Sequence, residues 1–240
     1  MGQCVLTAVV LLGLALAVAA PASGQPPLPM EQSAAWVYEA TVKWTPRDSG
    51  QVQTKRLKWT TEVISRVEHP GIIVAVIRGI PFELSWYEEG RQPGYSLMAW
   101  MNHRVYAIPM KSEAEARQAA RRFPRLTESL LKQADMFLDM PLKAGKRYAC
   151  EVERQDNWYC WYVEHEEQFR GPIKGWKPDG PAAMFRLAYR TNPDHRVVEF
   201  VPGLGVVRYF YRHHGTVAEA DLQLVEFRPG AASGPAPGKK

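Results

Sequence analysis

The feature that most constrains the fold of this chain is the alternation of apolar and polar residues. One face of residues 35–44, AWVYEATVKW, carries only apolar side chains: Trp36, Tyr38, Ala40, Val42 and Trp44. Successive side chains of a β-strand point to opposite sides, so this period of two indicates a strand buried on one face. Similar segments recur between turn signals, and we therefore predict a mainly β fold.

The strand-like segments form two groups with a helical region between them. Residues 35–108 predict an antiparallel meander of about five strands, the last of them over residues 95–108. The meander includes the apolar run IIVAVIRGI, which is typical of a central strand covered on both faces. Residues 112–140 predict two helices, the first opening with a Ser112–Glu115 capping box and stopping at Pro124. Residues 146–228 predict the second meander.

The expected fold class is thus mainly β with two helices (α+β). The antiparallel meanders would form a curved sheet, a sandwich or an open barrel, and the pattern alone does not choose among them. The 240 residues, 46% of them hydrophobic and 23% charged, suffice for a sizeable core. We expect one β-rich domain over residues 30–228 and a disordered tail over residues 229–240.

The N-terminus predicts export. Residues 1–24 read as a signal peptide, because a short apolar run is followed by small residues, with cleavage before Gln25 or before Ser23. An uncleaved anchor helix is the alternative. The mature chain would be periplasmic or extracellular, and soluble rather than membrane-spanning.

Two cysteines remain after the signal peptide. Folding residues 150–160 into a hairpin about Gln155 places Cys150 opposite Cys160. In an oxidising compartment this arrangement predicts a disulfide bond. The alternative is a pair of buried free thiols.

Four histidines are candidates for a site: His165, His195, His213 and His214. His213 and His214 are adjacent, and neighbours in a strand face opposite sides, so they cannot easily share a metal ion. His165 lies among glutamates without the spacing of a zincin helix. Asp194 and His195 fit a turn, and no serine elbow accompanies them. The sequence predicts no catalytic residue, cofactor or metal.

Basic and aromatic residues suggest two possible binding surfaces, each of which has a purely structural alternative. Arg117, Arg121 and Arg125 could form a cationic helix face for lipid headgroups or acidic envelope polymers, or simply a solvated face. A net charge of +5 without a basic motif argues against nucleic acid. An aromatic set could line an apolar cavity, stack on carbohydrate or form core: Trp36, Tyr38, Trp44, Trp59, Trp86, Trp100, Trp158 and Trp161.

The second half of the chain carries two motifs, DMPLKAGKRY at residues 139–148 and EFVPGLGVVRYFYRHHGTVAEADLQLVEF at residues 199–227. In them it resembles a loose family of secreted bacterial β-rich proteins of unknown function. Tyr148 stands where that family usually has Trp, and its PAGTF-x-C step has only the approximate counterpart GPAAMF. The resemblance implies a secreted, antiparallel β-rich fold, and it implies no activity or catalytic residue.

These observations favour an exported, non-enzymatic β-rich protein that binds an apolar or lipid-like ligand or an envelope partner. One alternative is a secreted hydrolase or metal-dependent enzyme that uses one of the four histidines. Another is a structural or assembly component of the cell envelope, which would show an exposed edge strand or apolar patch.

Overall fold

A computed structural model describes residues 24–46, 50–82, 92–151, 156–213 and 218–231. Several predictions made from the sequence lie outside these residues. They concern nearly all of the signal peptide, Trp86, His214 and most of the C-terminal tail.

In the described part of the chain, twelve strands and two helices follow one another. They are β1 (Ala35–Trp44), β2 (Gln53–His69), β3 (Ile72–Arg78), β4 (Tyr95–Met101), β5 (Arg104–Met110), α1 (Glu113–Arg121), α2 (Phe123–Leu131), β6 (Asp135–Asp139), β7 (Arg147–Tyr148), β8 (Trp161–Gln168), β9 (Ala183–Arg190), β10 (Asp194–Val201), β11 (Gly205–His213) and β12 (Ala218–Arg228). All strands belong to one antiparallel sheet, in the order β6-β5-β4-β3-β2-β1-β12-β11-β10-β9-β8-β7.

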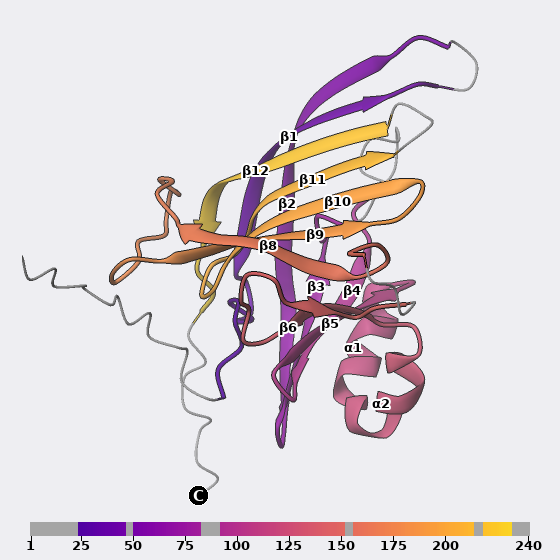
Figure 1. The fold of residues 1–240 in the computed structure, drawn as a ribbon. Coiled ribbons are helices and arrows are strands. Elements are labelled where there is room, and N and C mark those ends of the chain that lie inside the picture. The colour runs from indigo at the N-terminus through magenta and orange to yellow at the C-terminus, as the bar shows by residue number, and fades with distance from the viewer. Residues whose placement is uncertain (1–23, 47–49, 83–91, 152–155, 214–217, 232–240) are drawn as a thin grey trace, which may run out of the picture.

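The sheet joins the two predicted meanders through β1. This strand pairs with β2 on one side and with β12 on the other, so that Tyr38 lies between Trp59 and Leu224. Pairing between the first and last strands brings the two ends of the fold together in space (Figure 1). It also makes the two strand groups one continuous sheet.

The sheet curls until its two edge strands meet. The Tyr148 hydroxyl in β7 donates a hydrogen bond of 2.9 Å to the Phe137 carbonyl in β6. The Phe137 ring also lies 6.0 Å from that of Trp161 in β8. The predicted mainly β fold with two helices is therefore confirmed, and among the predicted arrangements the curved sheet is nearly closed into a barrel.

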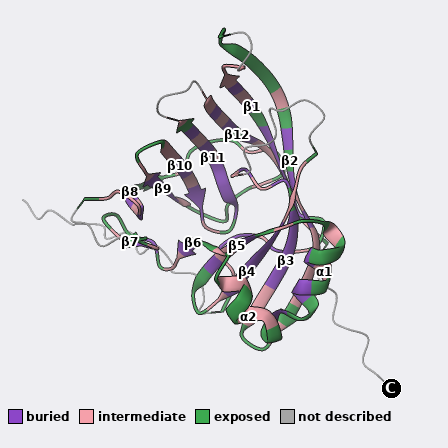
Figure 2. Ribbon diagram, turned by 90° about the vertical axis from the view of Figure 1, so that its right-hand side faces the viewer, coloured by how far each residue is buried: buried purple, intermediate pink, exposed green. Residues whose placement is uncertain are grey.

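The helices cover part of the outer surface of the sheet. α1 and α2 pack over β3, β4 and β5 (Figure 2), where Val74 and Val76 contact the buried alanines of α1 and Phe123. The alternate residues of β3, Ala75 and Ile77, point into the barrel. β3 is thus covered on both faces, as its apolar sequence predicts. Ser112 caps α1 by accepting a hydrogen bond from the backbone N–H of Glu115.

Two predicted elements differ from the structure. The helix expected to reach residue 140 ends at Leu131, and Asp135–Asp139 forms edge strand β6. Phe137 and Leu138 fit a helical period, but pairing with β5 buries both of them in the barrel. Residues 95–108 form two strands instead of the single one expected, because Asn102 and His103 take positive φ angles and make a tight turn.

Candidate functional site

A pocket of about 700 Å³ lies at one end of the barrel, which we call the pocket end. Three segments separated in sequence meet there: the chain after β6, the loop before β9 and the turn between β10 and β11. Its lining consists of Met140, Pro141, Leu142, Lys143, Glu166, Trp176, Lys177, Pro178, Asp179, Gly180, Pro181, Ala182, Ala183, Phe185, Pro202 and Gly203. Four prolines and two aromatic rings give this wall an apolar and rigid character.

The loop that carries Trp176 is fixed to the end of β12. The N–H of Lys174 donates to the Val225 carbonyl at 3.2 Å, and the N–H of Phe227 donates to the Lys174 carbonyl at 2.8 Å. Gly175 has a φ of +79°, and a Cβ there would lie 2.1 Å from the Phe227 carbonyl oxygen. Only glycine fits this close approach, so the backbone itself directs Trp176 toward the pocket.

The opposite wall is supported by the segment before β1. The N–H of Gly203 in the β10–β11 turn donates to the Pro27 carbonyl at 2.8 Å. Leu28 and Met30 follow, and both are buried in the barrel core. The predicted cleavage before Gln25 would therefore leave this supporting segment intact.

Charged side chains line the pocket without neutralising one another. Lys143, Lys177, Glu166 and Asp179 make no hydrogen bond or ion pair through their side chains in the described ranges of the chain. An apolar wall with a few unengaged polar groups is the usual character of a small-molecule site. The pocket can thus accept a ligand that has both an apolar body and a polar group.

The other end of the barrel, which we call the histidine end, holds a network of polar side chains. His213 Nδ1 lies 2.9 Å from Asp194 Oδ1, and the Tyr211 hydroxyl donates to the same oxygen at 2.5 Å. Burial alone would raise the pKa of Asp194, but the hydrogen bonds from His213 and Tyr211 outweigh it and leave that pKa lowered. Asp194 is therefore held as the carboxylate.

Further contacts extend this network across the interior. The Tyr189 hydroxyl donates to Glu151, and burial followed by this hydrogen bond raises the pKa of Tyr189. The guanidinium of Arg196 lies over the Tyr189 ring at 5.8 Å and 3.9 Å from a carboxylate oxygen of Asp135 in β6. These contacts join β6 to β9 and β10 and help to close the barrel.

The other described candidate histidines lie elsewhere. His195 follows Asp194 directly and contacts Arg190 Nε at 3.3 Å. His165 is exposed in β8, paired in register with Arg186. His213 contacts the carboxylate of Asp194, and no group of His, Cys, Asp and Glu among the described residues is arranged to hold a metal ion.

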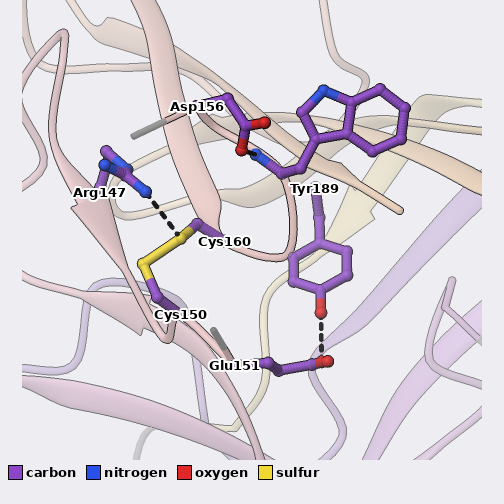
Figure 3. The surroundings of a disulfide bond; sticks show 7 residues. Arg147, Cys150, Glu151, Asp156, Cys160 and Tyr189 are labelled. Atoms are coloured by element: carbon purple, nitrogen blue, oxygen red, sulfur yellow. Dashed lines mark hydrogen bonds between the residues drawn. A yellow bond between two sulfur atoms is a disulfide. The ribbon is translucent and has the colours of Figure 1, made fainter. Parts of the chain in front are cut away.

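The two cysteines lie beside Glu151 and Tyr189, the pair that extends the network of the histidine end (Figure 3). The sulfurs of Cys150 and Cys160 are 2.08 Å apart, and Arg147 Nη2 lies 3.4 Å from that of Cys160. The hairpin predicted over residues 150–160 does not have the two cysteines in its paired strands. β7 ends at Tyr148 and β8 begins at Trp161, so both cysteines lie outside these strands.

The predicted basic helix face is partly neutralised. Arg117 forms an ion pair of 2.7 Å with Glu113, whereas Arg121 and Arg125 are exposed without an ion pair in the described chain. Neither of the two described helices has the length and apolar character that a membrane span requires.

Most of the aromatic residues considered as a cavity or stacking surface are core. The buried ones are Trp36, Tyr38, Trp59, Trp100 and Trp161, and Trp44 and Trp158 are half-buried. Sequence reasoning missed the pocket because its wall comes from segments assigned to loops. The clustering of Pro178, Pro181 and Trp176 in one Gly/Pro-rich loop was the signal that could have indicated it.

The sequence matches no protein-family model and no curated protein. Two solved structures are similar to it at 11% sequence identity. One is a candidate lipoprotein from Parabacteroides distasonis, which covers 84% of this chain and 97% of its own, with a TM-score of 0.35. The other is a candidate exported protein with a YmcC-like fold from Bacteroides fragilis, with coverages of 84% and 98% and a TM-score of 0.36. The structure of the chain itself shows that it is a β-rich protein. TM-scores this low indicate nothing about its function.

Proposed function

We propose that this is an exported binding protein whose ligand places an apolar body in the pocket at the pocket end. The observation that carries the proposal is the apolar wall of prolines, Trp176 and Phe185 around about 700 Å³, a volume suited to a small molecule. The signal-like N-terminus and the paired cysteines support export to an oxidising compartment.

The packing of the barrel interior favours a binding site at the end of the barrel and not at its centre. The residues at mid-height, including Val163, Leu187, Val198 and Tyr209, are almost completely buried against one another. A ligand there would have to displace close-packed core, which is costly. At the pocket end the wall is already formed by fixed loops.

The lining also suggests the class of ligand. Its apolar residues favour a hydrocarbon or ring system, while Lys143 and Lys177 could pair with an acidic group and Glu166 and Asp179 with a donor. An amphiphile such as a fatty acid satisfies both requirements, because its chain would contact the prolines and Trp176 and its carboxylate would face a lysine.

Displacement of a fluorescent apolar probe by palmitate would test the proposal. The gene is expressed at full length, and 1-anilinonaphthalene-8-sulfonate is titrated into the purified protein before palmitate is added. We expect saturable probe binding that palmitate reverses. Trp176→Ala should weaken binding about tenfold or more, since it removes a large aromatic contact. Ala182→Phe should block binding by filling the pocket.

Trp158→Ala is the matched control, because Trp158 is also half-buried but lies outside the pocket lining. It should leave palmitate affinity unchanged. Equal losses in Trp176→Ala and Trp158→Ala, or no palmitate binding to the unsubstituted protein, would contradict the proposal.

A further inference from the structure

The first half of β2 is an exposed strand whose second edge is unpaired among the residues that the structure describes. β1 pairs with residues 53–62 of β2, but β3 pairs only with residues 62–69. Gln53, Thr54, Lys55 and Arg56 are all exposed. Among the described strands, the segment thus has a single neighbour, β1, and its side chains face solvent.

This segment carries positive charge that no acidic residue within it offsets. The side chains of Lys55, Arg56 and Lys58 make no hydrogen bond or ion pair in the described part of the chain. Residues 50–61 contain no aspartate or glutamate. α1 differs, because Glu113 in it neutralises Arg117.

Arg56 and Lys58 line one hollow. They are two residues apart in a strand, so their side chains share a face, and they line a concavity of about 560 Å³ over β12, β1 and β2. Two carboxylates also line it. Arg208 neutralises Asp221 through hydrogen bonds of 3.0 and 2.9 Å. Glu39 lies opposite Lys58 in the strand register and is one acid against the two cations of the hollow, which leaves a net positive charge there.

An apolar side chain lies beside this positive segment. The side chain of Val52 is large, hydrophobic and 55% exposed, unlike the other large hydrophobic side chains of the described residues. It immediately precedes β2, about 13 Å along the strand from Arg56. Basic residues next to an exposed apolar one are typical of surfaces that rest on anionic lipid, where the cations meet phosphates and the apolar group reaches the acyl boundary.

We infer that the first half of β2 docks the protein on an anionic phospholipid surface. A headgroup phosphate lies in the hollow of Arg56 and Lys58, and Val52, directly before β2, contacts the membrane. This inference stands independently of the proposed ligand pocket, whose lining residues lie outside this surface.

Co-sedimentation with vesicles tests it. The full-length gene product is mixed with vesicles of phosphatidylcholine alone or with 30% phosphatidylglycerol, in low salt and in 0.5 M NaCl. Binding should require phosphatidylglycerol and fall at high salt, where the screening length is only a few ångströms. Arg56→Gln/Lys58→Gln should weaken binding roughly 30-fold, from the effect of two basic residues near an anionic surface.

Arg121→Gln/Arg125→Gln is the matched control, since it removes the same charge from two exposed, unpaired arginines elsewhere. It should change binding less than threefold. Equal losses in the two double variants would overturn the inference in favour of a non-specific charge effect. A larger loss in the control would assign docking to the helices instead.

Val52→Ser separates a membrane from other anionic partners. It should weaken vesicle binding severalfold and leave binding to soluble polyglutamate unchanged, because only a membrane offers an apolar phase. If Val52→Ser has no effect on vesicles, the partner is a soluble polyanion and the inference fails. If Arg56→Gln/Lys58→Gln only aggregates and keeps its vesicle affinity, the charges serve to protect a free edge, which also overturns it.

Discussion

The two ends of the barrel interior use polar residues in different ways. At the histidine end, polar side chains bond to one another, as Asp194 does with Tyr211 and His213. At the pocket end, Lys143, Glu166 and Lys177 have no such partners in the described chain, and prolines form part of the walls. A nearly closed sheet can thus be stabilised at one end by hydrogen bonds between its own side chains, while the other end keeps polar groups, unpaired among the described residues, that a ligand can bind.

Phe137→Ala should have the largest effect, because this residue joins both ends. Its ring lies 4.7 Å from that of Phe82, 6.0 Å from Trp161 and 6.3 Å from Phe200, and it is 2% exposed. We expect the free energy of unfolding to fall by about 3–5 kcal/mol in urea denaturation. Phe137→Leu should lose clearly less, and a small loss in both would show that β6 does not hold the barrel closed.

Removing the cysteine pair should lower the stability of the protein without altering the pocket end of the folded state. The bond closes a loop with a sequence separation of 10. Cys150→Ala/Cys160→Ala should therefore lower the free energy of unfolding by about 2–3 kcal/mol, mainly by freeing the unfolded chain. Binding of the apolar probe at the pocket end should persist under conditions where the variant is folded. Loss of probe binding in the folded variant would show that the two ends are coupled.

Two buried tyrosines offer a matched test of hydrogen bonding. The Tyr38 hydroxyl donates to the Val206 carbonyl at 2.9 Å, whereas the Tyr209 hydroxyl has no partner among the described residues. Tyr38→Phe should cost about 1 kcal/mol of unfolding free energy, and Tyr209→Phe should be neutral or stabilising. Thermal and urea unfolding would compare them. A cost of 1 kcal/mol or more for Tyr209→Phe would indicate a bound water at its hydroxyl.

The smallest expected effect is on the loss of stability at acidic pH. The pKa of Asp194 is lowered in the folded protein, so its contribution to stability is present above the ordinary carboxyl value of 3.8 and is lost as pH falls below it. Asp194→Asn should flatten the decline of stability between about pH 5 and pH 2 relative to the unsubstituted protein. Glu166→Gln, at the pocket end, should leave that decline unchanged. The same flattening in both variants would contradict the conclusion that, among the described residues, carboxylates are hydrogen-bonded at the histidine end and unpaired at the pocket end.

Residues with strong local preferences were predicted well. The alternation in residues 35–44 places Trp36 and Tyr38 in the core, and the Ser112 cap begins α1 where expected. Phe137 was assigned to a helix because a short apolar cluster satisfies both periods, and only pairing with β5 decides between them. Asn102 and His103 were missed as a turn because neither is glycine, although Asn tolerates positive φ.

The sequence by itself determined the mainly β class, the two-helix insertion and the candidate cysteine pair, because these depend on local periodicity and spacing. Only the tertiary structure decided that β1 pairs with β12, that His213 meets Asp194 while His195 turns to Arg190, and that loops around Trp176 and Pro202 enclose a pocket. Each of these joins residues far apart in the chain or depends on which face of a strand a residue occupies. Strand register fixes that face, and a single segment of sequence does not contain the register.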